Sequence, residues 1–129
     1  MEVPEELFYT MTHEWIRREG RECIVGISAH AQQELRDIVF VELPKVGALV
    51  SQGKPAAVIE SVKAAFDIYA PVSGRITKVN EALTKSPQIV NQDCYQAGWL
   101  FVIEPSAAEE FTNLLSPETY RQQVAAQAH

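Results

Sequence analysis

The sequence contains few cysteines and histidines, and this scarcity excludes several classes of protein. Cys23 and Cys94 are the only two cysteines among 129 residues, too few for a disulfide scaffold, and neither lies in a C-x-x-C motif. In a reducing compartment both are expected to be free thiols. The three histidines, His13, His30 and His129, show no spacing typical of metal ligands, so the sequence predicts no metal site.

The sequence also has no excess of basic residues and no long apolar run. Lys and Arg number 11 against 17 Asp and Glu, which gives a formal net charge of -6. Such a surface repels nucleic acid and anionic membranes, so neither is expected as a partner. No apolar run approaches the roughly 20 residues that cross a bilayer. Segment 1–6 is acidic and unlike a signal peptide, so we expect a cytoplasmic protein.

What the chain does contain is the composition of an ordinary folded domain, with 47% hydrophobic and 22% charged residues. Its length suits one hydrophobic core. Turn residues recur between short apolar stretches, which predicts many short strands. We therefore expect a single domain over 1–129, with a β body over about 7–104 and C-terminal helices over about 106–126.

Strand patterns occupy four stretches of the body, at 22–27, 38–43, 75–80 and 99–103. A short helix is expected over 29–35, where the hydroxyl of Ser28 can accept a hydrogen bond from a first-turn N–H. In 38–43, strict alternation would place Ile38 and Phe40 on one face and Val39 and Val41 on the other.

The C-terminal region shows two helix signals. Ser106 and Glu109 have the spacing of a capping box, in which the two side chains satisfy free N–H groups reciprocally. The pair Ser116–Pro117 begins a second helix, with Tyr120 and Val124 on one face. These signals predict a C-terminal helical pair.

The segment Glu60-Ser61-Val62-Lys63-Ala64-Ala65 is the one that suggests chemistry. Small residues follow Lys63 and leave its amine unobstructed, and Glu60 and Asp67 flank it. The amine of an exposed lysine is protonated at neutral pH, which disfavours Schiff-base chemistry and fits acylation by another enzyme. Taken alone, the pattern fits a solvated lysine at a hairpin tip better than a modification site. No nucleophile–base pair or cofactor motif is visible, so no active site is expected.

Motifs along most of the chain resemble the H-protein family of the glycine cleavage system. The matching stretches are Thr12–Trp15, Val25–Ile27, Asp37–Pro44, Glu60–Ala64, Asp67–Gly74 and Val79–Leu83. The lysine motif with its acidic flanks is the most specific of them. The resemblance implies a mainly β, lipoyl-type fold: a flattened β-barrel of two antiparallel sheets (a barrel-sandwich hybrid), with short helices and the C-terminal helical pair.

The resemblance also implies a function. Lys63 would carry lipoic acid in amide linkage, as a swinging arm that ferries an aminomethyl group and electrons between enzymes. The implied partners are a lipoate-protein ligase or lipoyltransferase and the glycine cleavage enzymes, namely the decarboxylase, the aminomethyltransferase and dihydrolipoamide dehydrogenase. The protein itself would be a monomeric carrier and not an enzyme.

In this family the loaded arm folds into a surface cleft. The matching positions here are Thr12, Glu14 and Asp67, and Glu34 falls in the same region, where some members carry histidine. Glu60 completes the acidic flank of the arm. Without the resemblance, Glu14 would be interpreted as a solvated charge and Asp67 as a turn carboxylate.

The sequence departs from the family pattern at several positions. Arg36 replaces a usual glycine, and Phe66 replaces a small residue close to the arm. In the loop over 93–99, Cys94 stands in place of a proline and Gln96 in place of a glycine. Cys94 is either drift in a loop or a redox thiol that exchanges with a dithiolane.

These departures leave two other functions open. The chain could be an H-protein-like lipoate-binding protein of bacterial sulfur oxidation, carrying sulfur-containing intermediates to a heterodisulfide-reductase-like complex. It could also be a scaffold on which lipoyl groups are assembled before they pass to other proteins.

Overall fold

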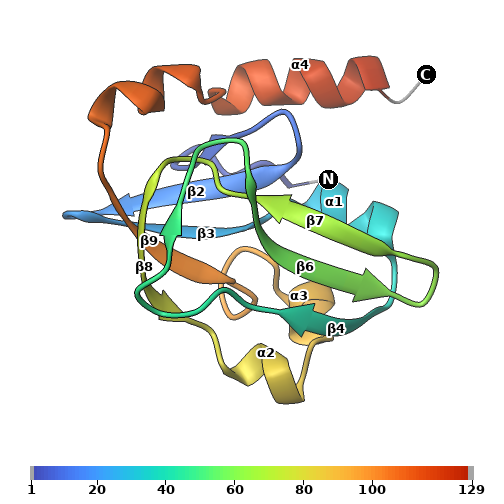
Figure 1. Cartoon of the computed structure of the whole chain (residues 1–129). Coiled ribbons are helices and arrows are strands. Elements are labelled where there is room, and N and C mark those ends of the chain that lie inside the picture. The colour runs from blue at the N-terminus through green and yellow to red at the C-terminus, as the bar shows by residue number, and fades with distance from the viewer. Residues whose placement is uncertain (1, 128–129) are drawn as a thin grey trace.

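The computed structural model describes residues 2–127, and its strands form two antiparallel sheets (Figure 1). The larger sheet has six strands. In spatial order they are β1 (Phe8–Tyr9), β2 (Glu14–Glu19), β3 (Glu22–Ile27), β9 (Phe101–Pro105), β8 (Gly74–Val79) and β5 (Leu49–Val50). The predicted strands at 22–27 and 75–80 are confirmed to within a residue. The last strand begins later than predicted, because the N–H of Trp99 closes a turn onto the carbonyl oxygen of Gln96.

The smaller sheet has three strands, in the order β4 (Ile38–Glu42), β6 (Pro55–Ser61) and β7 (Ala65–Tyr69). The strict alternation expected in 38–43 is wrong. Ile38 and Val41 are buried while Val39 and Phe40 are exposed, because a β-bulge shifts the register against β6 between Ile38 and Phe40. A bulge adds one residue to a strand and so changes which side chains share a face.

The helices are short. They are α1 (Ala29–Leu35), α2 (Ala82–Lys85), α3 (Ile89–Gln92), the 3₁₀ helix η1 (Ala108–Asn113) and α4 (Pro117–Gln127). The predicted cap of α1 is confirmed, since the Oγ of Ser28 accepts a hydrogen bond from the N–H of Ala31 at 3.2 Å. In α4 the predicted buried face of Tyr120 and Val124 is also confirmed.

The predicted capping box at Ser106 and Glu109 is wrong. Residue Ala107 precedes η1, and no side chain caps that helix. The N–H of Ser106 instead donates to the carbonyl oxygen of Ser73, which ties this residue back to the sheet. In this region the carboxylate of Glu110, and not that of Glu109, bonds to the backbone: it accepts hydrogen bonds from both the N–H and the hydroxyl of Ser73.

The core lies between the sheets and under α4. Trp15 is fully buried opposite Gly26 on the neighbouring strand, and a Cβ at Gly26 would lie 2.5 Å from the indole ring. That glycine therefore makes room for the largest core side chain. Helix α4 is attached through Tyr120, whose ring stacks on that of Tyr9 at 4.4 Å between centroids.

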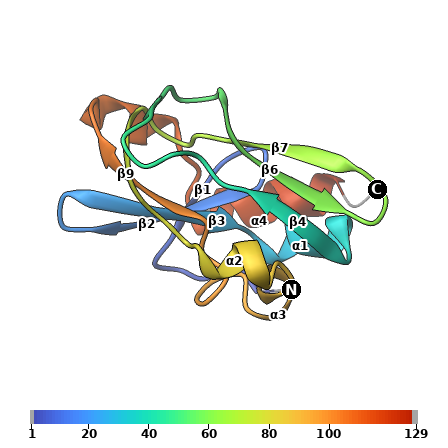
Figure 2. The ribbon, with the colours of Figure 1, turned by 60° about the horizontal axis from the view of Figure 1, so that its bottom comes forward.

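The predicted fold class is confirmed as mainly β, with two antiparallel sheets, short helices and a C-terminal helix. Strand pairing among residues 2–127 leaves the two sheets separate, so they do not close into one barrel. In the same residues, no helix has the length and hydropathy that a membrane-spanning helix needs. The β6–β7 hairpin extends from the body beside α1, as both views show (Figure 2).

Candidate functional site

Lys63 lies in the turn of the β6–β7 hairpin, which connects Ser61 to Ala65. Its side chain is exposed, as are those of its neighbours Val62 and Ala64. Among residues 2–127 the structure records no ion pair that involves Lys63. Lys63 is therefore exposed to solvent at the end of the hairpin.

Ser61 makes several of the hydrogen bonds that hold the backbone of this turn. The Oγ of Ser61 accepts hydrogen bonds from the N–H groups of Lys63 and Ala64, both at 3.3 Å. The N–H of Ser61 donates to the carbonyl oxygen of Ala64 at 2.8 Å. Short polar side chains stabilise turns in this way by bonding to nearby backbone groups.

Glu60 and Asp67, the predicted acidic flanks, are both exposed and share one face of the hairpin. Asp67 lies opposite Val58 in the hairpin, and Val58 is two residues before Glu60 on the same strand. Side chains two residues apart on a strand point to the same face, so Glu60 and Asp67 lie on one side. Phe66 points to the opposite face with Ile59. Because β7 is an edge strand, side chains of both its faces reach the rim of the sheet.

A surface cleft of about 300 Å³ opens between this edge and α1. Its lining comprises Thr12, His13, Ile27, Ala31, Glu34, Leu35, Phe66, Asp67 and Ile68. Three of the residues predicted for the arm cleft, Thr12, Glu34 and Asp67, are thus brought together although they are far apart in sequence. Glu60 is not among the lining residues and lies only on the outer face of the hairpin.

Glu14 occupies a different place. It is 1% exposed, so the alternative of a solvated charge is wrong, and it lines a second pocket next to Thr12. Its Oε1 accepts hydrogen bonds from the hydroxyls of Thr10 and Thr12 at 2.5 and 2.6 Å, and its Oε2 accepts one from the N–H of Tyr69 at 3.1 Å. Burial raises the pKa of Glu14, and these hydrogen bonds oppose that shift. Glu14 thereby connects β2 to the end of β7.

Two of the departures from the family pattern lie close to the hairpin and cleft. Phe66 contributes its ring to the cleft lining. Arg36 follows α1 at φ 63° and ψ -138°, a conformation suited to glycine and strained for any other residue. The side-chain amide of Asn91 donates to the carbonyl oxygen of Arg36 at 2.6 Å and its Oδ1 accepts from the N–H of Ile38 at 3.0 Å, which holds this corner in place.

The two thiols are poor candidates for redox chemistry. Cys94 is 8% exposed, and burial raises its pKa to about 12, which disfavours the reactive thiolate. Its carbonyl oxygen accepts a hydrogen bond from the indole N–H of Trp15 at 3.0 Å, so it belongs to the core. Cys23 is buried in β3, and burial raises its pKa to about 11.

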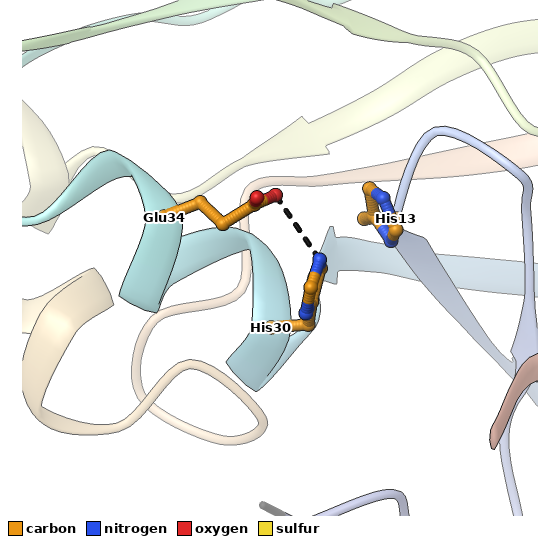
Figure 3. A group of neighbouring side chains, drawn as sticks. All are labelled: His13, His30 and Glu34. Carbon is orange, nitrogen blue, oxygen red and sulfur yellow. Dashed lines mark ion pairs between the residues drawn. The ribbon is translucent and has the colours of Figure 1, made fainter. Parts of the chain in front are cut away.

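One cluster was missed by the sequence prediction. His13, from the loop before β2, and His30 and Glu34, from α1, point toward one another, with all ligand atoms within 4.8 Å (Figure 3). The sequence spacing gave no reason to group His13 with His30, and the fold brings them together, whereas His129 lies outside the described residues. The i,i+4 spacing of His30 and Glu34 was a usable signal, but the approach of His13 depends on the fold.

Comparison with known proteins supports one family. The model of the glycine cleavage H-protein family matches residues 7–127. A glycine cleavage system H protein of Shewanella loihica is 58% identical over 120 residues, which cover 92% of this chain and 93% of that protein. One from Thermus thermophilus is 48% identical over 128 residues, covering 99% of this chain and 100% of that protein.

A solved structure agrees with the sequence comparison. The crystal structure of a glycine cleavage system H protein from Mycobacterium marinum superposes with a TM-score of 0.88 at 38% identity, and the match covers 95% of this chain and 99% of that one. The extent of these matches confirms the resemblance that the lysine motif first indicated. The chain belongs to the glycine cleavage H-protein family, whose members are carriers without an active site of their own.

Proposed function

We propose that this protein is the lipoyl carrier of glycine cleavage, with lipoic acid in amide linkage on Lys63. The observation that carries the proposal is the placement of Lys63 at an exposed hairpin tip beside a cleft. A lipoyl group supplies a dithiolane that can carry an aminomethyl unit and electrons. In this proposal the β6–β7 hairpin presents the arm to other enzymes, and the cleft receives the arm and shields it from water.

The hairpin is suited to modification by a lipoate-protein ligase or lipoyltransferase. The hydrogen bonds of Ser61 give the turn a defined shape before any enzyme binds. Glu60 and Asp67 place negative charge on one face of the hairpin, where a basic surface of the modifying enzyme can dock. The small side chain of Ala64 leaves room around the amine.

The cleft is within reach of an arm on Lys63. Phe66 lies three positions further along the chain, and a fully extended backbone would separate the two residues by at most about 11 Å. Ile27, Leu35 and Phe66 provide apolar surface that would exclude water from a loaded arm. Glu34 and Asp67 provide carboxylates that can accept hydrogen bonds from a cationic amine on the cargo.

We propose that the decarboxylase, the aminomethyltransferase and dihydrolipoamide dehydrogenase of glycine cleavage act on the arm in turn. The protein would act as a monomeric single domain in the cytoplasm. The net charge of -6 supports solubility and basic docking partners, and argues against nucleic acid and membranes as partners.

A carrier role in sulfur oxidation is less favoured, because the relatives reported above are named for glycine cleavage. Reconstitution with glycine decarboxylase tests whether the protein serves glycine cleavage. The lipoylated protein should support exchange of the glycine carboxyl group with bicarbonate, and the Lys63→Arg variant should not. If the lipoylated wild type supports no exchange, glycine cleavage is the wrong pathway. Transfer of its lipoyl group to a second protein would instead favour the scaffold.

A further inference from the structure

At the wall of the cleft, three side chains of metal-ligand type lie close together, with their ligand atoms within 4.8 Å of one another (Figure 3). The Nε2 of His30 lies 3.1 Å from the Oε1 of Glu34, and the rings of His13 and His30 are 4.5 Å apart between centroids. We propose that His13, His30 and Glu34 form a binding site for a divalent transition-metal ion of the Zn²⁺ class. This inference is independent of lipoylation.

The geometry of the helix supports the site. His30 and Glu34 are four residues apart in α1, so both project from the same face of the helix. Two ligands of a tetrahedral Zn²⁺ ion are separated by about 3.3 Å, given bond lengths of about 2.0–2.1 Å. The observed 3.1 Å between the two ligand atoms is close to that separation. His13 lies within 4.8 Å of both, so a small side-chain rotation completes the set.

The backbone around His13 holds this residue toward α1. The N–H of His13 donates to the carbonyl oxygen of Thr10 at 3.2 Å, and its own carbonyl oxygen accepts from the N–H of Ser28 at 2.9 Å. Its φ is 75°, which is uncommon for a residue other than glycine. These contacts connect the loop of His13 directly to the residue that caps α1.

A partly buried hydrogen-bond chain orients the imidazole of His13. Its Nδ1 lies 2.7 Å from the hydroxyl of Tyr120, which lies 2.6 Å from the Oγ of Ser28. Ser28 also accepts from the N–H of Ala31. If each group donates to the next, from Nδ1–H through Tyr120 to Ser28, the Nε2 of His13 keeps its lone pair for a ligand. Metal-binding histidines commonly donate their other ring N–H to such a partner.

The ligand set defines the class of ion. Two imidazole nitrogens and one carboxylate suit Zn²⁺ and its neighbours in the transition series, whereas Ca²⁺ and Mg²⁺ prefer sites made of oxygen alone. Three protein ligands leave one tetrahedral position for water or another ligand. His13 and Glu34 also line the cleft, so the ion would lie at its wall.

Isothermal titration of Zn²⁺ into the unlipoylated full chain tests the proposal. We expect one ion per chain, with the affinity reduced at least about tenfold in His30→Gln and in Glu34→Gln. Glu118→Gln and Cys94→Ser should bind like the wild type. The same chain carrying Lys63→Arg should also bind normally, which separates this test from that of the carrier function.

The proposal is overturned if the wild type does not bind Zn²⁺, or if Glu34→Gln binds as well as the wild type. The side chain of Glu34 is 64% exposed, so this variant is expected to stay folded. A measurement on the wild type needs no variant at all. Zn²⁺ should shift the ring-nitrogen NMR signals of both His13 and His30, and an unshifted His13 would contradict the site.

Discussion

The N–H of Val62 donates to the carbonyl oxygen of Asp37 at 3.1 Å. This hydrogen bond joins the turn that presents Lys63 to the corner between α1 and β4. The lysine is therefore exposed but its backbone is not free to move independently of the body. A modifying enzyme meets a turn of defined shape, which lowers the cost of ordering it on binding.

The serine in this turn should matter for modification. In Ser61→Ala, the N–H groups of Lys63 and Ala64 lose their acceptor, so the turn becomes less ordered. We expect a lower kcat/KM of lipoate-protein ligase for this variant and a loss of about 1 kcal/mol in unfolding free energy. Ser51→Ala, in an exposed turn elsewhere, is the control. Equal lipoylation of Ser61→Ala and wild type would show that the turn needs no such support.

Arg36→Gly should stabilise the protein. Arg36 has a φ of 63°, where a side chain is strained, and glycine relieves this strain at some cost in unfolded-state entropy. We expect a net gain of about 1 kcal/mol in urea unfolding. Arg36→Ala keeps a Cβ at the same backbone conformation and should show no such gain. A glycine variant no more stable than the alanine variant would mean that this corner is not strained.

Glu14→Gln should destabilise the fold although the change is small. The amide has one acceptor oxygen in place of two, so it cannot accept from the two threonine hydroxyls and from the N–H of Tyr69 together. We expect a loss of about 1–3 kcal/mol. Glu118→Gln, at an exposed position, should leave the unfolding free energy nearly unchanged. Similar stability of both variants would argue against the bonding described for Glu14.

Cys94 should behave as a core residue. Burial raises its pKa to about 12, so iodoacetamide should modify it far more slowly in the native protein at pH 8 than in denaturant. The arm should therefore be reduced and reoxidised equally well in Cys94→Ser. Rapid native labelling together with lost carrier activity would instead support a redox role for this thiol.

Local signals in the sequence predicted much of the fold. Ser28 caps α1 as expected, and the strands at 22–27 and 75–80 follow their apolar patterns. Local patterns fail where distant residues decide the outcome. The bulge in β4 depends on pairing with β6, and Ser106 bonds to Ser73 rather than capping η1.

The same limit applies to the site. A pattern of charged residues cannot distinguish an exposed carboxylate such as Glu60 from a buried one such as Glu14, because burial depends on which strands pack together. The cluster of His13 with α1 likewise arises only when the loop before β2 packs beside that helix. The exposed turn at Lys63 could be predicted because it depends on a short contiguous segment.

The most direct test of the account is the intact mass of the protein after co-expression with a lipoate-protein ligase and lipoate. The wild type and the Lys54→Arg control should each gain the mass of one lipoyl group, and Lys63→Arg should gain none. Fragmentation should place the added mass on Lys63. An unmodified wild type, or a lipoyl group retained in Lys63→Arg, would contradict the assignment of Lys63 as the carrier residue.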